Sequence, residues 1–307
     1  MSESQSKTAI NIISGKPPLD ESYYNPDDEE LTFYKSQTGI ADDQALKDHI
    51  TRIQTDAYET VYPYPCIRRF AFMRLKISRL PAYPKLLRLG KEREGAIFLD
   101  IGCCFGNDVR KAIADGYPRE NCIASDLESD FWKLGHRLFN TDPETFPVPF
   151  IPGDAFDPNF IQSEPPFYSL LESPAPQLSR LTTLTPLLGR VSAIHASSLF
   201  HLFDEAKQLQ LARALAGLLS PQPGSLVFGM HGGRQEKGFE TEQGVPGQTG
   251  TYMFCHCPDS WTELWDGVVF EKGTVRVEAE LKQIERRDIK AEPGTKFYAL
   301  LWSVTRV

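Results

Sequence analysis

The residues most suited to chemistry lie in one stretch, 98–113, which reads Phe-Leu-Asp-Ile-Gly-Cys-Cys-Phe-Gly-Asn-Asp-Val-Arg-Lys-Ala-Ile. An apolar run ends in Asp100, a turn containing Gly102 and Gly106 follows, and an amphipathic helix begins near Asn107. Glycine allows the positive φ angles and the close ligand approach that such a turn requires. The helix start presents unpaired N–H groups and a positive dipole end to whatever lies above the turn. The pattern therefore predicts a binding element for a nucleotide-type ligand.

Further polar groups end the next predicted strands. Asp126 ends the second strand, where a carboxylate can accept hydrogen bonds from both hydroxyls of a ribose. Asp154 ends the third, placed to accept from an adenine amino group, and Leu127 or Phe156 is expected to flank the ring. His195 ends the fourth strand, beneath the rest of the ligand. Because ligands of open α/β sheets bind outside the carboxyl ends of the strands, we expect these groups at one site.

The spacing of the turn discriminates between two kinds of nucleotide. A dinucleotide site uses the order G-x-G-x-x-G, with a phosphate over the helix start. Here the order is Asp100-x-Gly102-x-Cys104-x-Gly106, which lacks the third position of that fingerprint. An acid two residues before the first glycine suits the ammonium of a cationic ligand better than a pyrophosphate. The turn resembles motif I of class I methyltransferases that use S-adenosylmethionine (SAM), with Cys104 where a glycine is usual.

A wider resemblance rests on short segments spread along the chain. They are Tyr34-x-x-x-Thr38-Gly-Ile40, Tyr64-Pro-Cys-Ile-Arg68, Leu99-Asp-Ile-Gly-Cys-Cys104, Asp115-Gly116, Leu134-Gly135 and Phe254-x-His256-x-Pro258-x-Ser260-Trp261. From about residue 33 onward the chain resembles the fungal methyltransferases of the austinol and terretonin meroterpenoid pathways. The resemblance implies O-methylation, notably of a substrate carboxylate, with SAM converted to S-adenosylhomocysteine. With the strand-end groups, it implies SAM contacts at Tyr34, Asp100, Gly102, Cys103, Gly106, Asp126, Leu127, Asp154, Ala155, Phe156, His195 and Ala196.

The acceptor side is less defined by the sequence. A carboxylate acceptor needs no general base, whereas a phenol or alcohol would benefit from one. His201, between apolar residues, and His231, at the end of the fifth predicted strand, are the candidate bases. Phe72 is expected in the roof of the pocket, and Arg68 could pair with an acceptor carboxylate. We therefore predict substrate contacts at Arg68, Phe72 and His231.

The elements that position these groups follow from hydrophobic periodicity. Strands and helices alternate from residue 96, which predicts a Rossmann-like α/β fold: a class I methyltransferase sheet of seven strands whose last pair forms an antiparallel hairpin. We divide the chain into a mobile leader (1–30), an N-terminal helical cap or lid (31–95) and the SAM-binding domain (96–307). Within the cap, residues 67–80 are predicted as one helix, and the glycine-rich segment 232–250 as a long loop.

Composition bounds the partners. A formal net charge of −8 and an isoelectric point near 5.4 argue against nonspecific binding of nucleic acid. The N-terminus lacks the apolar region of a secretory signal, and no apolar run approaches the ~20 residues that span a bilayer. Cys255-His-Cys257 lacks a second ligand pair, so no metal site is expected. We expect a cytoplasmic protein with a small-molecule acceptor and without a membrane partner. The sequence is compatible with a homodimer.

The sequence therefore favours a SAM-dependent O-methyltransferase acting on a carboxylate or hydroxyl of a polyketide- or terpenoid-type metabolite. One alternative is a protein of the same fold that has lost methyl transfer and acts as a cyclase or isomerase. A second is an NAD-dependent oxidoreductase. A third is a regulatory subunit that binds SAM without turnover.

Overall fold

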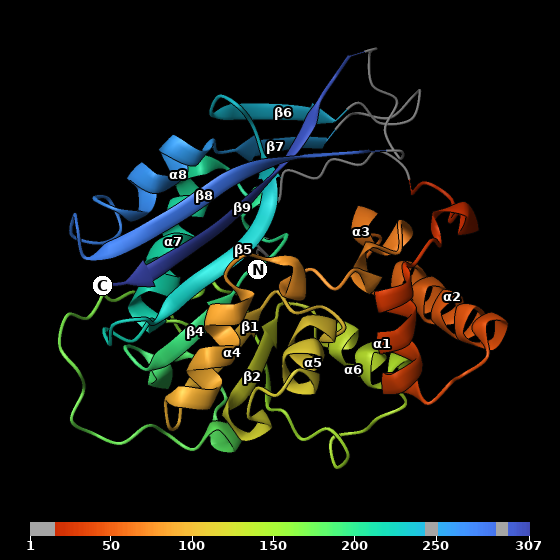
Figure 1. Ribbon diagram of the computed structural model, residues 1–307, viewed down its shortest axis with the longest axis horizontal. Helices are drawn as coiled ribbons and strands as arrows, with labels where there is room; N and C mark the ends of the chain where they lie inside the picture. The colour runs from red at the N-terminus through yellow and green to blue at the C-terminus, as the bar shows by residue number, and fades with distance from the viewer. Residues whose placement is uncertain (1–15, 243–250, 287–293) are drawn as a thin grey trace, which may run out of the picture.

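The protein is organised around a seven-stranded mixed sheet with the strand order β3-β2-β1-β4-β5-β9-β8 (Figure 1). The computed structural model describes residues 16–242, 251–286 and 294–307. The strands of the sheet are β1 (Ile97–Ile101), β2 (Cys122–Asp126), β3 (Phe150–Pro152), β4 (Val191–His195), β5 (Leu226–Gly233), β8 (Val275–Ile284) and β9 (Phe297–Arg306). The first five are parallel, whereas β9 pairs antiparallel with both β5 and β8. This confirms the predicted Rossmann-like sheet and its terminal hairpin.

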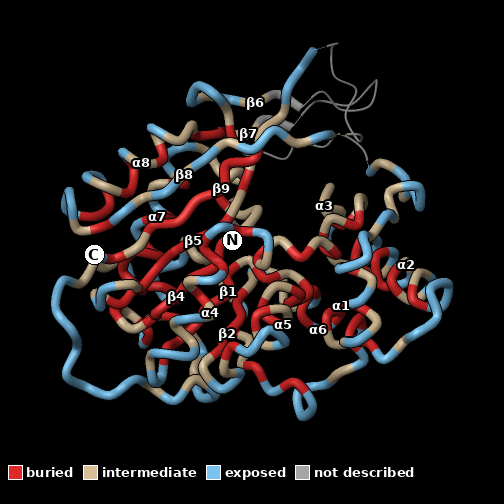
Figure 2. The backbone as a smooth tube through the Cα atoms, viewed as in Figure 1, coloured by how far each residue is buried: buried red, intermediate tan, exposed pale blue. Residues whose placement is uncertain are grey.

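The centre of the sheet is buried on both faces (Figure 2). Every residue of β1 and of β4 is buried, as expected for parallel strands that helices cover on both sides. Asp100 and His195 are therefore buried polar residues inside otherwise apolar strands, and the parallel register pairs their Cα atoms. Two strand-end groups far apart in sequence thus become neighbours at one edge of the sheet.

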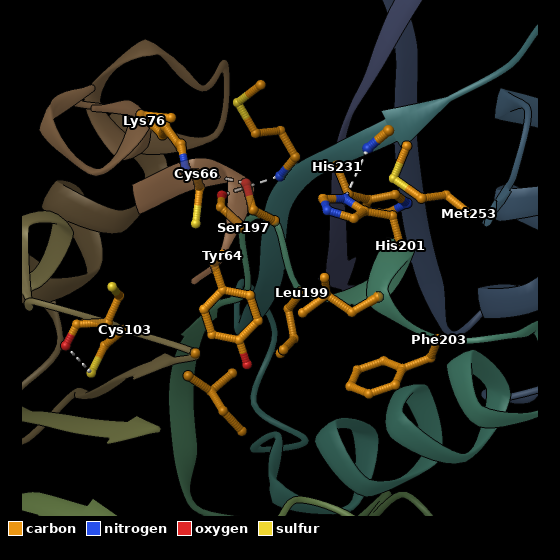
Figure 3. Close-up of a pocket in the computed structure, with 18 of the residues that line it drawn as sticks. Tyr64, Cys66, Lys76, Cys103, Ser197, Leu199, His201, Phe203, His231 and Met253 are labelled. Atoms are coloured by element: carbon orange, nitrogen blue, oxygen red, sulfur yellow. Dashed lines mark hydrogen bonds between the residues drawn. The ribbon is translucent and has the colours of Figure 1, made fainter. Parts of the chain in front are cut away.

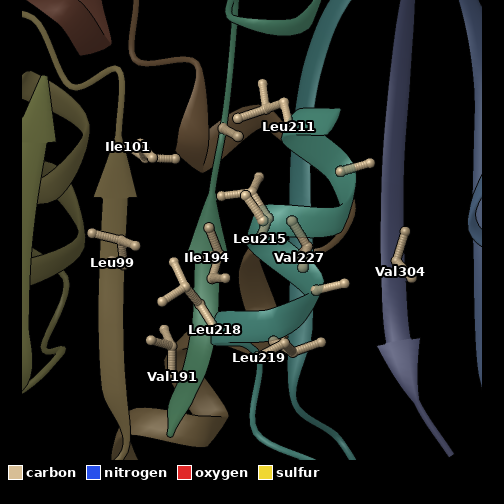
Figure 4. Packing of buried hydrophobic residues seen from close by; sticks show 14 of the residues in the cluster. Leu99, Ile101, Val191, Ile194, Leu211, Leu215, Leu218, Leu219, Val227 and Val304 are labelled. Carbon is tan, nitrogen blue, oxygen red and sulfur yellow. The ribbon is translucent and has the colours of Figure 1, made fainter. Parts of the chain in front are cut away.

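Helices cover the two faces. On one face, α4 (Tyr83–Glu92) and α5 (Asn107–Ala114) contribute to a buried cluster with residues of β1, β2, β4 and β5. On the other, α7 (Glu205–Leu218) and α8 (Pro258–Trp265) pack against the sheet. Figure 4 shows the α7 side chains Leu211, Leu215 and Leu218 directed at the strands. Helix α6 (Ser129–Leu138) joins β2 to β3 and packs against the N-terminal helices.

The N-terminal helices form their own apolar cluster beside α5 and α6 (Figure 1). They are α1 (Asp28–Thr38), α2 (Asp43–Thr60) and the short α3 (Pro65–Arg68). A capping box starts α1: Asp27 accepts from the Glu30 amide, and Glu30 accepts from the Asp27 amide. The Glu30 side chain is fully buried and ion-paired with Arg74 and Arg79, which ties α1 to the segment before α4.

Two sequence predictions within these regions are wrong. Residues 67–80 form α3, a left-handed Phe70 (φ 54°) and two 3-10 turns, because almost every apolar side chain there is buried and no single helix face could bury them all. The segment 232–250 is not simply a loop, since β5 continues to Gly233 and β6 (Gly238–Glu242) pairs with β7 (Thr251–Cys255). Glycines 244, 247 and 250 lie outside the described residues.

The leader is described only from residue 16, and residues 1–15 lie outside the described part. Lys16 pairs with Glu59, and the Tyr58 hydroxyl donates to the Pro17 carbonyl. These contacts hold residues 16 and 17 against the end of α2. Among the described helices, none is both long and apolar enough to cross a bilayer.

Candidate active site

A cavity of about 480 Å³ opens at the carboxyl edge of β1, β2, β3 and β4 (Figure 3). The cap contributes Tyr64, Phe72 and Lys76 to its wall, and the later elements contribute His201 and Met253. The strand ends, the N-terminal cap and the later elements of the chain thus all line one cavity. It is where the sequence expects a nucleotide and an acceptor to meet.

Most of the predicted site residues line this cavity. They are Phe72, Asp100, Gly102, Cys103, Asp126, Leu127, Asp154, Ala155, Phe156, His195, His201 and His231. The remaining predicted residues, Tyr34, Arg68, Gly106 and Ala196, are not part of its lining.

Three of these residues are instead buried or hydrogen bonded away from the cavity. Tyr34 is fully buried in the cap cluster, where its hydroxyl donates to the Phe72 carbonyl at 3.3 Å. Arg68 donates from Nε to the Pro18 carbonyl at 2.8 Å, so its guanidinium is engaged by the leader. Ala196 is fully buried in the apolar cluster beneath α7. We leave these residues out of the proposed site.

Gly106 lies at the N-cap of α5 with a φ of 73°, and a Cβ there would come within 2.5 Å of the Trp132 ring. Glycine is required at this position for backbone conformation and for packing. It shapes the turn without lining the cavity, and we leave it out of the proposed site as well.

A buried chain of hydrogen bonds runs behind the cavity. Asp100 Oδ1 is 2.8 Å from His195 Nδ1, and His195 Nε2 is 2.7 Å from Ser197 Oγ. Burial disfavours the charged imidazolium, but the hydrogen bond and charge of Asp100 outweigh it and raise the pKa of His195. His195 thereby fixes the Asp100 carboxylate, whose Oδ2 is buried and has no partner among the described residues.

The turn after β1 is held by Asp126. Its Oδ2 accepts from the Cys104 amide at 2.8 Å, and its Oδ1 accepts from the Glu128 amide at 3.0 Å. Cys104 is left-handed with a φ of 51°, so the turn keeps the conformation that a glycine would adopt more readily. Burial raises the pKa of Asp126, and the two amides partly offset this.

The cavity also has basic residues in its wall. Arg69 and Lys76 from the cap and Arg286 after β8 line it, and Lys76 Nζ donates to Ser198 Oγ at 3.2 Å. His201 lies within this group of cations. Burial, followed by the positive charges of Lys76, Arg286 and Arg69, lowers the pKa of His201 to about 3. The cavity wall thus holds these cations together with the acids of the strand ends.

His231 lines the same cavity but is buried at the base of the terminal sheet. The Trp302 indole N–H donates to His231 Nδ1 at 3.0 Å, and the ring packs against Trp261 at 4.8 Å between centroids. Burial lowers the pKa of His231 well below its usual value. A histidine that stays neutral in this way is a weak proton acceptor.

Several lining residues are not apparent from the sequence. Ser197 and Ser198 follow the predicted residues His195 and Ala196 directly, but no sequence pattern points to their hydroxyls. Lys76 reads as part of a solvated helix face, and Arg286 follows β8 without any local signal. Both cations reach the cavity only through long-range packing.

No group of three or more His, Cys, Asp or Glu residues able to hold a metal occurs in the described ranges. His256, in the Cys-His-Cys segment, hydrogen bonds through Nδ1 to Ser260 Oγ at 2.9 Å. Cys257 is the N-cap of α8. The segment therefore contributes to the start of a helix.

Comparison with known sequences gives a consistent set of relatives. Residues 21–73 match the family model described as the meroterpenoid methyltransferase N-terminal domain. The chain is 33% identical to O-methyltransferase phiE from a fungal species over 80% of this chain and 72% of that protein. It is 32% identical to the asnovolin E/chermesin D methyltransferase nvfJ of Aspergillus novofumigatus over 85% of this chain and 83% of that protein.

Solved structures give only distant likeness. One is the Burkholderia thailandensis 1,6-didemethyltoxoflavin-N1-methyltransferase, with a TM-score of 0.45 and 12% identity over 87% of this chain and 92% of that chain. This value is too low to add to the fold described above.

Proposed function

This chain belongs to the family of fungal meroterpenoid O-methyltransferases, enzymes that use SAM to methylate a secondary metabolite, and we propose that its acceptor is a carboxylate. The observation that carries this proposal is the set of cations in the cavity wall that act on His201, namely Arg69, Lys76 and Arg286. Guanidinium and ammonium groups pair with carboxylates through charge-assisted hydrogen bonds. An alcohol acceptor would gain little from three cations.

The strand-end groups fit SAM. Asp100 Oδ2 is a buried carboxylate oxygen without a partner among the described residues, and such an atom is costly unless a ligand donates to it. The SAM ammonium is a donor of the required kind. We propose that Asp100 holds this ammonium and that Asp126 accepts from the ribose hydroxyls. Leu127, Asp154, Ala155 and Phe156 then surround the adenine.

When bound, SAM supplies an electrophilic methyl group, so the chain's own residues mainly have to align the acceptor and exclude water. Tyr64 and Phe72 from the cap and Leu199 after β4 give the cavity an apolar wall. The cations hold an acceptor carboxylate in its ionised form. We therefore propose that no side chain has to remove a proton before transfer.

The test is an assay of the full chain with SAM and a panel of acids. The panel holds asnovolin E and chermesin D, the compounds named for one relative, together with terpenoid and polyketide carboxylic acids and the matching alcohols. Formation of S-adenosylhomocysteine and of a product heavier by one methylene unit is followed by mass spectrometry. Mild alkaline hydrolysis cleaves a methyl ester but leaves a methyl ether intact.

We expect esters from acids and no product from the matching alcohols. Arg286→Gln and Lys76→Gln are expected to raise KM for the acid, whereas a matched charge removal at the exposed Lys133 should leave it unchanged. Ether products from alcohols, or an unchanged KM in both cavity variants, would contradict the carboxylate assignment.

Nothing in the comparisons favours the cyclase, isomerase or oxidoreductase alternatives. A cyclase or isomerase would form product without consuming SAM, and an oxidoreductase would change nicotinamide absorbance. The homodimer and the cytoplasmic location stay predictions, to be checked by light scattering and by microscopy of a fluorescently tagged chain.

A further inference from the structure

His201 is hydrogen bonded in a way that fixes where its proton lies. The Gly232 amide donates to His201 Nδ1 at 3.2 Å, and Figure 3 shows this bond on the ring beside Met253. A backbone N–H can only donate, so Nδ1 must carry its lone pair. In a neutral imidazole the single hydrogen then resides on Nε2. The backbone of β5 thereby selects one tautomer.

The charged groups around His201 keep the ring neutral. Burial and the positive charges of Lys76, Arg286 and Arg69 all oppose a second proton, and they lower the pKa of His201 to about 3. Glu240 lines the same cavity but is ion-paired with Arg234 at 2.9 Å. His231, whose ring centroid is 6.4 Å away, has a lowered pKa and adds no negative charge.

His231 is fixed in the same tautomer by a different donor. The Trp302 indole N–H also can only donate, and it donates to His231 Nδ1 at 3.0 Å. The hydrogen of His231 therefore also lies on Nε2, which is buried and has no partner among the described residues. Neither histidine offers the cavity a basic Nε2 lone pair, and His201, being half-buried, is the one that an acceptor can reach.

We propose that His201 contacts the acceptor as a hydrogen-bond donor, its Nε2–H binding one oxygen of the carboxylate, and that it is not a general base. This inference rests on the proposed function and deepens it. The second carboxylate oxygen uses a lone pair to form the bond to the methyl carbon, while the electron pair of the broken C–S bond stays on sulfur. A carboxylate anion and a sulfonium cation become a neutral ester and a neutral thioether, so no proton has to leave. The site therefore takes acids that are already ionised.

The direct test is nitrogen-detected NMR of the full chain labelled with ¹⁵N-histidine and without any ligand. His201→Gln assigns the His201 signals by their loss. We expect His201 in the Nε2–H form, without protonation, between about pH 6 and 8. An Nδ1–H tautomer, or titration within that range, would overturn the inference. Because this readout needs no turnover, its failure is distinct from that of the proposed function, which fails if the wild type methylates no acid.

Kinetics with an acid that the wild type methylates give the second test. Glutamine can accept from the Gly232 amide and still donate to the acceptor, whereas phenylalanine can do neither. His201→Gln should stay within a few-fold of wild-type kcat/KM, and His201→Phe should raise KM at least ~10-fold, the effect of one lost charge-assisted hydrogen bond. His49→Gln on α2 is the matched control. A general base would instead show a large loss of kcat in both His201 variants.

Discussion

Replacement of Asp126 by alanine tests the nucleotide end of the site. The carboxylate already accepts from two backbone amides, at 2.8 Å from Cys104 and 3.0 Å from Glu128, so its oxygens are fixed before any ligand binds. A hydrogen bond to a charged group contributes about 1.5–3 kcal/mol. Because 1.4 kcal/mol is a factor of ten, Asp126→Ala should weaken S-adenosylhomocysteine binding about 10- to 150-fold. Loss of the amide contacts should also cost ~1 kcal/mol of folding stability.

The assay is calorimetric titration with S-adenosylhomocysteine and with its analogue lacking both ribose hydroxyls. If Asp126 binds those hydroxyls, the wild type should discriminate strongly between the two ligands and Asp126→Ala should discriminate little. The control is Asp130→Ala, since Asp130 is exposed on α6 and is not part of the cavity lining. Equal discrimination by wild type and Asp126→Ala would show that the affinity loss came from the distorted turn. The ribose assignment would then be wrong.

Three further outcomes follow from the packing and the buried pair. Gly135→Ala on α6 would bring a Cβ within 2.2 Å of the Phe105 carbonyl in the turn, so we expect it to destabilise the fold by about 1–3 kcal/mol in urea unfolding. The pKa of His195 is raised by Asp100, so its stabilising contribution is complete below its unfolded pKa of about 6.5 and is lost as pH rises through the higher folded value. His195→Gln should remove this pH dependence from the free energy of unfolding. An unchanged pH dependence would show that the Asp100–His195 pair does not cause it. Tyr34→Phe should cost only ~1 kcal/mol and leave S-adenosylhomocysteine affinity unchanged.

The nucleotide end could be predicted because its signals are local. Asp100, Gly102 and Asp126 each lie at a strand end or in the turn that follows, and an open α/β sheet brings such positions to one edge. The parallel part of the sheet followed from the alternation of strands and helices. What the pattern did not show is that His195 lies behind Asp100 and holds it, because the register between β1 and β4 is a long-range property.

The acceptor end could not be predicted in the same way. Arg68 and Arg69 are adjacent in the sequence, yet Arg69 lines the cavity and Arg68 donates to the leader. The expected helix over 67–80 gave no means to tell them apart, and the left-handed Phe70 that breaks it has no sequence signal. Arg286 lies more than two hundred residues from Arg69 and reaches the same cavity because it follows β8 of the terminal hairpin. Composition and periodicity contain no information about which distant residues line the same cavity.

One short segment of the cap is hydrogen bonded to two elements of the cavity wall. Lys76 Nζ donates to Ser198 Oγ after β4, and the next amide, that of Ile77, donates to Asp108 Oδ1 at the start of α5 at 3.1 Å. The cap is therefore hydrogen bonded both to the helix above the SAM turn and to the loop beneath the acceptor. An alkyl transfer requires its two reactants in line, and a misplacement of about 1 Å can reduce the rate by ~100-fold. Because Lys76 and Ile77 are consecutive, they fix one of the cations proposed for the acceptor, that of Lys76, relative to the SAM turn. We therefore infer that the cap aligns the two reactants as well as covering them.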